Sequence, residues 1–252
     1  MPSRLRTLFA EEKTAFGVWI MLSSPAAVEM IASMGFDYVG IDCQHGLLDY
    51  GEMRDILLML RGFETSPVVR VPSGESSIVG RALDAGAEAI VVPMVNSRFE
   101  AEQAAAACRL PPDGLRSFGP ARAHQPFGRD PAEINRDVLC FAMIETRHGL
   151  AAADEICSTP GVDGIYVGPS DLALSLGFTP MGTDYPPEHV EAVAAILRAC
   201  ETHGRIPAIH AYGGANARMR AEQGFRMVTV TADAAVLALG SLTELGTARG
   251  SS

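Results

Sequence analysis

Two acidic residues are spaced as a metal site would require. Glu145 ends one apolar run, and Asp171 follows the next apolar run along the chain. Carboxylates that converge repel each other unless a cation lies between them, and a hard divalent ion such as Mg²⁺, Mn²⁺ or Co²⁺ binds such oxygens together with water. The pair therefore indicates a divalent-metal site, although Asp171 is equally suited to cap a helix that begins at Leu172.

Arg70 lies between valines inside another apolar run. A buried arginine is costly unless it is paired, so it either holds ligand oxygens or forms an ion pair with Asp42 or Glu145. His45 follows Asp42 by three residues, and a carboxylate that orients an imidazole is the usual partner of a general base. The alternative is that His45 is a structural histidine in a turn.

Lys13 is the only lysine of the chain. An aldolase that forms an imine with its substrate needs a lysine inside the active site, and Lys13 precedes the first apolar run. If the protein forms carbanions, a metal ion must therefore accept the negative charge.

These residues must be positioned by a regular framework. Eight short, almost continuously apolar runs predict strands that are buried on both faces: Phe16–Leu22, Tyr38–Asp42, Pro67–Val71, Ala89–Met94, Leu139–Glu145, Gly164–Val167, Ile206–His210 and Met227–Thr231. Between them lie amphipathic helical patterns, several of which end in glycine: Ala26–Met34, Glu52–Leu60, Ser76–Ala85, Arg98–Cys108, Val190–His203, Asn216–Gln223 and Ala234–Leu245.

Eight such βα units predict an α/β protein whose parallel strands close into a single (β/α)8 TIM barrel over residues 1–252. The alternative, an open doubly wound sheet, lacks the glycine-rich phosphate turn. In a barrel, reactive side chains project from the C-terminal ends of the strands, where the acids, Arg70 and His45 are expected, and where the seventh strand ends at His210. Two longer connections, Arg109–Asp137 and Leu176–Glu188, are expected to cover the site or contact another subunit.

Composition excludes several classes of protein. The 252 residues carry a net charge of −10, which argues against binding to nucleic acid or to an anionic membrane surface. The five cysteines form no CxxC pair, which is typical of reduced thiols in the cytoplasm. The N-terminal residues lack the apolar core of a signal peptide, and no apolar run reaches the length of a membrane span.

Several motifs, in this order, resemble the HpcH/HpaI aldolase family. They are FGVWIMLSSP, GFDYVGIDCQHG, VVRVP, AGAEAIVVPMV, the turn at Pro111–Ser117, AMIET and GVDGIYVGPSDLA. The resemblance implies a class II, divalent-metal-dependent aldolase, a lyase that joins a 2-oxo acid such as pyruvate or hydroxypyruvate to an aldehyde, or cleaves the resulting 4-hydroxy-2-oxo acid. It also implies a homohexamer whose last helix is exchanged between subunits.

The family pattern carries over to individual residues. By resemblance, Glu145 and Asp171 bind the metal. Arg70 holds the oxygens of the 2-oxo acid and stabilises its enolate. His45 is the catalytic histidine and moves a proton to and from the aldehyde oxygen.

Further positions follow from the same resemblance. Asp84 would support the catalytic histidine from across a subunit boundary, and the backbone amides of Ser170 and Asp171 would bind the substrate carboxylate at a helix N-terminus. Gln44, expected to contact the substrate, replaces a glutamate that commonly precedes the histidine, so it brings no charge close to the metal. Met143 replaces a glutamine found in some members.

Two other functions remain open from the sequence. A citryl- or malyl-thioester lyase of related fold would need a nucleotide-binding surface, and the chain has no basic cluster for one. A non-catalytic barrel that binds an organic acid is a third class. The complete set of Arg, Glu, Asp and His argues against it.

Overall fold

A computed structural model of the chain describes residues 3–119, 130–180 and 182–250. Eight parallel strands form a closed barrel in which each strand pairs with its neighbours in sequence and β8 pairs with β1. The strands are β1 Ala15–Ile20, β2 Tyr38–Asp42, β3 Ser66–Arg70, β4 Ala89–Val92, β5 Leu139–Ile144, β6 Gly164–Val167, β7 Ile206–His210 and β8 Met227–Ala232. The predicted (β/α)8 barrel and its eight strands are thus confirmed, with bounds that differ by at most two residues.

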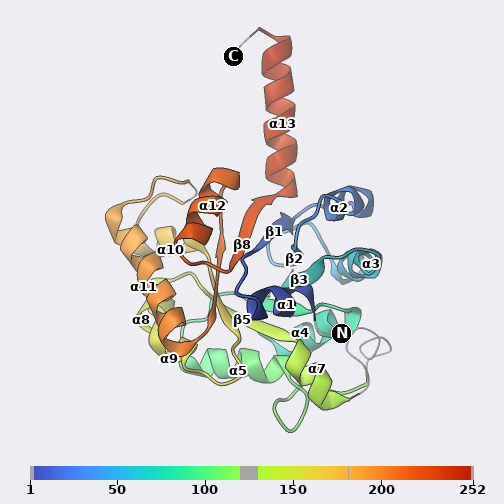
Figure 1. Cartoon of the computed structure of the whole chain (residues 1–252), viewed down its shortest axis with the longest axis vertical. Helices are drawn as coiled ribbons and strands as arrows, with labels where there is room; N and C mark the ends of the chain where they lie inside the picture. Colours follow the sequence, from blue (N-terminus) through green and yellow to red (C-terminus); the bar gives the residue numbers. More distant parts are fainter. Residues whose placement is uncertain (1–2, 120–129, 181, 251–252) are drawn as a thin grey trace.

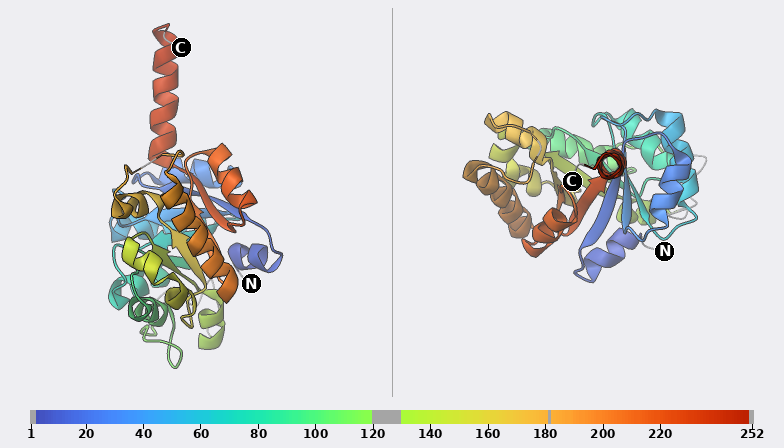
Figure 2. Two further views of the ribbon diagram at one scale, coloured as in Figure 1. Left: turned by 90° about the vertical axis from the view of Figure 1, so that its left-hand side faces the viewer. Right: turned by 90° about the horizontal axis from the view of Figure 1, so that it is seen from above.

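The helices surround the barrel, as Figures 1 and 2 show. They are α1 Arg4–Ala10, α2 Pro25–Ala32, α3 Tyr50–Leu60, α4 Ser76–Ala85, α5 Arg98–Cys108, α7 Pro131–Asp137, α8 Arg147–Ala151, α9 Ala153–Cys157, α10 Pro169–Leu176, α11 Pro187–His203, α12 Gly214–Glu222 and α13 Asp233–Ala248. The sequence did not predict α1, α7, α8 or α9, because five to seven residues are too few to show a helical period. Leu5 of α1 is fully buried among the side chains inside the barrel.

The two predicted long connections have different structures. The second half of Arg109–Asp137 contains α7, which Asp130 caps at its N-terminus, while residues 120–129 lie outside the described part of the chain. Within Leu176–Glu188, α10 ends at Leu176 and α11 already begins at Pro187. The remaining residues that are described there form no helix or strand.

Side chains on each strand alternate between the barrel interior and the surrounding helices. The interior ones form a cluster of their own that includes Ala15, Trp19, Tyr38, Val68, Val91, Phe141, Met143, Tyr166, Ala208 and Met227. Glycines make room for the largest of them. A Cβ at Gly40, for example, would come within 2.4 Å of the Trp19 ring. Trp19 therefore fills the barrel just below the C-terminal ends of the strands, which we call the mouth.

One polar group is buried in the middle of the barrel. The hydroxyls of Tyr38 and Tyr166 both lie within hydrogen-bond distance of the Thr229 Oγ1, at 2.7 and 2.6 Å. All three side chains are fully buried. Each hydroxyl therefore has its partner inside the protein, as a buried polar group requires.

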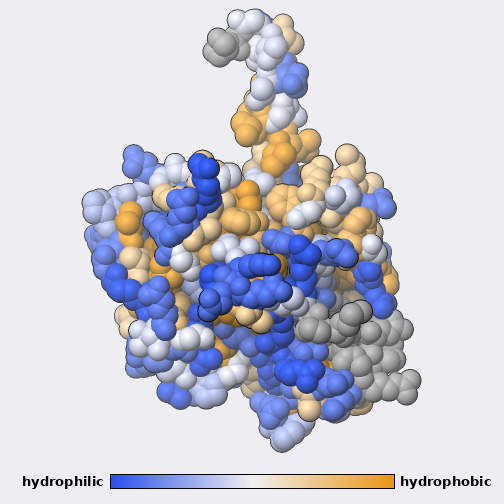
Figure 3. Space-filling view, viewed as in Figure 1, coloured by the Kyte–Doolittle hydropathy of each residue, from blue (hydrophilic) through white to orange (hydrophobic). Residues whose placement is uncertain are grey.

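The last helix, α13, stands apart from the barrel. It follows β8 directly at the mouth and projects along the long axis of the molecule (Figures 1 and 2). Asp233, its first residue, accepts hydrogen bonds from the backbone amides of Met21 and Leu22 at 2.9 and 3.1 Å. Beyond this anchor its apolar side chains are exposed, including Leu239 and Leu242 at 69% and 67% (Figure 3).

Among the described residues, no helix combines the length and the apolar character that a membrane span requires.

Candidate active site

Asp42 and Arg70 form an ion pair at the mouth. Asp42 is the last residue of β2 and Arg70 the last of β3, and the strand register places them side by side. The guanidinium donates from Nε to Oδ1 at 2.9 Å and from Nη2 to Oδ2 at 2.6 Å. Burial alone would raise the pKa of Asp42, but the hydrogen bonds from Arg70 hold it below its usual value. The pair therefore remains charged, and its planar geometry fixes the direction of the guanidinium.

The partner of Arg70, which the sequence left open, is thus Asp42. Asp42 Oδ1 also accepts hydrogen bonds from the backbone amides of Gln44 and His45 at 3.0 and 3.2 Å. The expectation that Asp42 orients the imidazole of His45 needs correction, because Asp42 holds the main chain of this turn. Its Oδ1 accepts three hydrogen bonds, from the Arg70 guanidinium and the two amides, and its Oδ2 accepts one from Arg70. The ring of His45 is left exposed at the surface of the mouth.

Glu145 follows β5 directly and is 2% exposed. Its Oε1 accepts a hydrogen bond from the backbone amide of Met94 at 2.8 Å. Its other oxygen lies over Gly168, where an added Cβ would come within 2.5 Å of Oε2. The glycine after β6 therefore leaves the space that this carboxyl group occupies.

The electrostatic environment of Glu145 favours the binding of a cation by its carboxyl group. Burial, together with the charge of Asp171, raises the pKa of Glu145 to about 7. A cation between the two carboxyl groups would relieve both effects. The described residues contain no group of three or more His, Cys, Asp or Glu side chains that could hold a metal. Two protein oxygens, with water and substrate oxygens completing the shell, suit Mg²⁺ and similar ions rather than a structural zinc site.

Asp171 and Ser170 lie in the first turn of α10. The helix begins after Gly168, and the amide of Leu172 makes the first helical bond to the Gly168 carbonyl at 3.1 Å. The amides of Ser170 and Asp171 precede it and have no partner within the helix. Such amides at a helix N-terminus are suited to a carboxylate. Asp171 is on the first turn of this helix without capping it, since no side-chain cap is formed.

Gln44 lies two residues beyond Asp42, in the turn that follows β2. Its Oε1 is buried and has no hydrogen-bond partner within the described residues. Leaving such an acceptor unpaired costs free energy comparable to a lost hydrogen bond. The Gln44 acceptor is open to a hydrogen-bond donor from a ligand or from water.

Two residues lie at the opposite end of the barrel. Asp84 is near the end of α4, which runs back from the mouth, and its carboxylate pairs with the buried Arg116 at 2.8 Å. A single chain therefore does not bring Asp84 to His45. Lys13 precedes β1, and its exposed ammonium group pairs with Glu11 at 2.8 Å. Lys13 thus lies far from the mouth, as predicted.

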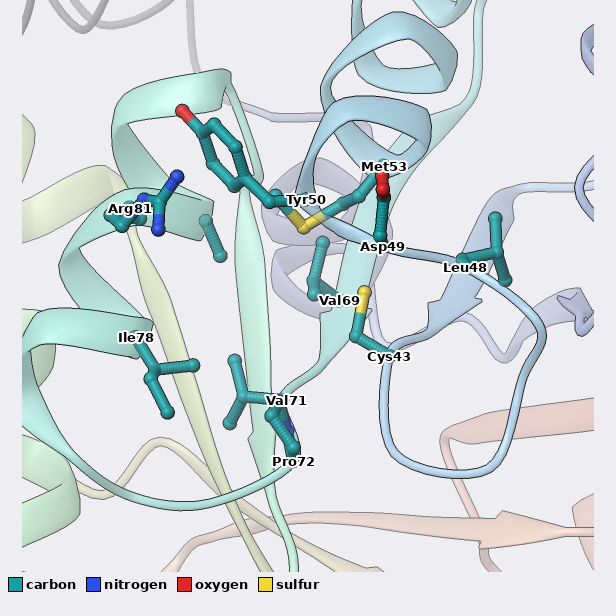
Figure 4. Close-up of a pocket in the computed structure, with 11 residues that line it drawn as sticks. Cys43, Leu48, Asp49, Tyr50, Met53, Val69, Val71, Pro72, Ile78 and Arg81 are labelled. Atoms are coloured by element: carbon teal, nitrogen blue, oxygen red, sulfur yellow. The ribbon is translucent and has the colours of Figure 1, made fainter.

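A separate cavity of about 280 Å³ lies behind the site, between α3 and α4. Cys43 points into it from the end of β2, together with Val69 and Val71 of the β3 segment (Figure 4). These side chains alternate with Asp42 and Arg70, so the cavity is on the outer side of the strands. Burial, followed by the charge of Asp42, raises the pKa of Cys43 to about 12, which keeps this thiol protonated.

Sequence reasoning assigned no role to two side chains at the mouth, although it placed His210 at the end of the seventh strand. Trp19 lies beneath the guanidinium of Arg70, 5.5 Å from its carbon to the ring centroid. His210 forms a T-shaped contact with Trp19, with the ring centroids 5.9 Å apart. The signal for both was strand alternation, because each shares the inward side of its strand with smaller buried residues.

Comparisons with known proteins show the family to which the chain belongs. The sequence profile of the HpcH/HpaI aldolase/citrate lyase family matches residues 15–239. The chain belongs to this family. It is 36% identical to a hydroxypyruvate/pyruvate aldolase of Rhizorhabdus wittichii, over 98% of this chain and 99% of the relative. It is 35% identical to a 5-keto-4-deoxy-D-glucarate aldolase of Escherichia coli, over 93% and 92% of the two chains.

The solved structures give the same result. A family protein from Burkholderia cenocepacia superposes with a TM-score of 0.89 at 32% identity, over 97% of this chain and 98% of the other. The resemblance predicted from the sequence is therefore confirmed, and the chain is an aldolase of this family, an enzyme of the carbon–carbon lyase class.

Proposed function

We propose that the protein uses a divalent cation of the Mg²⁺, Mn²⁺ or Co²⁺ type to join a 2-oxo acid, pyruvate or hydroxypyruvate, to an aldehyde, and to cleave the resulting 4-hydroxy-2-oxo acid. The observation that carries this proposal is the buried Glu145, whose charge is disfavoured by its burial and by Asp171. A cation bound there would neutralise negative charge that develops on the 2-oxo acid.

The protein side chains have separate roles in this proposal. The amides of Ser170 and Asp171 bind the carboxylate of the 2-oxo acid, and Arg70 donates to its carbonyl oxygen. Since Asp42 already fixes the guanidinium, no reorganisation is needed as negative charge grows on that oxygen. His45, exposed at the rim, moves the proton to and from the aldehyde oxygen.

A chelation experiment tests the proposal. Protein treated with a chelator should lose turnover of pyruvate with a panel of aldehydes, and Mg²⁺, Mn²⁺ or Co²⁺ should restore it. Glu145→Gln should not be restored by these ions. Full turnover by the chelated protein, with no metal by elemental analysis, would contradict the proposal.

The position of Lys13 leads to a second test. Borohydride added with pyruvate should change neither the mass nor the activity of the enzyme, because no lysine is present at the mouth to form an imine. A stable pyruvyl adduct would contradict the assignment to the metal-dependent class.

We also propose that the chain forms a homohexamer in which α13 packs on a neighbouring subunit, and that Asp84 supports the His45 of another subunit. The exposed leucines of α13 support this, since a helix with this much exposed apolar surface is stabilised by a partner. Leu239→Asp with Leu242→Asp should lower the mass measured by sedimentation, whereas Glu244→Asp on the same helix should not.

A cytoplasmic location is part of the same proposal. The five cysteines are free thiols, and Cys108 contacts Cys140 as Cys157 contacts Cys200, without a disulfide. Such neighbouring thiols suit a reducing compartment. Cell fractionation that recovers the enzyme with periplasmic or secreted proteins would contradict it.

A further inference from the structure

His210 is directed toward the mouth of the barrel. It is the last residue of β7 and shares the inward side of that strand with Ala208, which is buried in the barrel interior. Its register partner on β8 is Thr229, another inward residue. His210 as a residue is partly exposed. A ligand at the mouth can therefore contact the ring.

The neighbours of His210 are the groups proposed to hold the 2-oxo acid. On one side its ring forms a T-shaped contact with Trp19, which itself lies beneath Arg70. On the other side it contacts the ring of Tyr212, with the centroids 5.6 Å apart. The Tyr212 hydroxyl contacts the hydroxyl of Ser170 at the start of α10. His210 thus lies between the guanidinium and the helix N-terminus that would bind the two ends of the acid.

The ring nitrogens of His210 have no hydrogen-bond partner among the described residues. In the core histidine His189, by comparison, Nε2 lies 2.9 Å from the Pro169 carbonyl oxygen, while Nδ1 has no partner among the described residues. Burial, and then the charge of Arg70, lowers the pKa of His210 to about 4. The imidazole is therefore neutral near pH 7, with one nitrogen that donates and one that accepts. A hydroxyl group, which also donates and accepts, is the matching partner.

We propose that His210 is a specificity-determining residue that binds the hydroxyl group on carbon 3 of the 2-oxo acid, so that the enzyme selects hydroxypyruvate over pyruvate. The inference rests on the proposed aldolase reaction and names the donor class of the same site. A site that pairs with a substrate hydroxyl discriminates against the analogue lacking it, because its own polar group is then left without a partner.

The test compares two donors with one aldehyde. The ratio of kcat/KM for hydroxypyruvate to that for pyruvate is measured for the Mn²⁺-loaded wild type, His210→Phe and His210→Asn. His210→Phe should lower the ratio about five- to tenfold, the value of one neutral hydrogen bond, mainly through hydroxypyruvate. His210→Asn, which keeps a donor and an acceptor, should retain most of it. His203→Phe, the same change on α11, should leave the ratio unaltered.

Calorimetric binding of each donor without aldehyde provides a second readout. An unchanged ratio in His210→Phe, or equal losses for both donors, would overturn the inference. If the ratio for glycolaldehyde to acetaldehyde changes instead, the hydroxyl belongs to the aldehyde and the donor assignment is wrong. If the wild type turns over neither donor, the proposed function fails, and the binding ratio alone decides the role of His210. Should His210→Phe not fold, His210→Ala replaces it.

Discussion

Polar side chains occur in two layers of the barrel interior, the middle layer and the mouth. Only in the middle layer does every polar side chain that we described have a hydrogen-bond partner within the protein. In the middle layer, Tyr38 and Tyr166 meet on Thr229, and each buried hydroxyl has a partner. At the mouth, Gln44 Oε1 is buried without a partner. His210, at the end of β7, makes ring contacts with Trp19 and Tyr212. The middle layer stabilises the barrel, whereas the mouth retains unpaired groups that a ligand can satisfy. Unpaired buried atoms also occur elsewhere, for example at Thr65 and Arg116, so the contrast holds between these two layers of the interior.

The strongest test of this contrast is at Arg70, which belongs to the mouth although its charge is paired. Arg70→Lys should fold but lose about 10²–10³ in kcat/KM, because an ammonium group cannot bind Asp42 and also direct donors at the substrate oxygen. Steady-state kinetics with pyruvate measures this. Arg198→Lys, in an exposed pair with Glu191, is the control. Wild-type rates in Arg70→Lys would make Arg70 structural.

The middle layer should respond in the opposite way. Thr229→Val removes the shared partner of two buried phenols and should lower the free energy of unfolding by about 2–4 kcal/mol. The kcat of the folded enzyme should change little. Urea unfolding with parallel kinetics measures both, with the exposed Thr202→Val as the control. Lost activity at unchanged stability would assign Thr229 to the site.

Glu145 links stability to pH in the metal-free enzyme. Its pKa of about 7 lies above the ordinary value of 4.5, so the folded state binds the proton more tightly than the unfolded state. Stability is therefore lost as pH rises from about 4.5 to about 7. Glu145→Gln avoids this loss and should be more stable by on the order of 1–3 kcal/mol at pH 8, with no such gain at pH 4.5. Urea unfolding in chelator at both values tests this, and equal gains at both would contradict it.

The smallest effect is expected at Gln44. Gln44→Glu places a negative charge where an unpaired amide oxygen now lies, and it should tighten metal binding about three- to tenfold and shift the pH–rate profile. Metal titrations of both proteins at one pH measure the change, and Gln103→Glu on the exposed face of α5 is the control. Overlapping titration curves with unchanged pH profiles would show that Gln44 takes no part in metal binding.

Much of the fold could be predicted because each apolar run and each helix-ending glycine carries its own local signal. The position of the acids, Arg70 and His45 at strand ends followed directly from that pattern. The helices α8 and α9 could not be predicted, since five residues give no period. The start of α13 is anchored by Asp233 on the amides of Met21 and Leu22, which lie far away in the sequence, so local sequence does not encode this contact.

Within the site, residue types were easier to predict than their partners. Arg70 was expected to pair with either of two acids, and only the register of β2 against β3 selects Asp42. The space that Gly168 leaves for Glu145 depends on two strands meeting in three dimensions. His210 had a usable signal, an imidazole on the inward side at the end of a strand, but its neutral state depends on burial and on Arg70.

The exposed Lys13 has a practical consequence for handling the enzyme. Reagents that acylate primary amines have a single side-chain target, located at the end of the barrel opposite the mouth. Besides the amino terminus of the chain, attachment to a resin or a sensor surface would therefore occur at one defined point. An enzyme immobilised in this way would present its mouth to the flowing solution, without any engineered tag near the site.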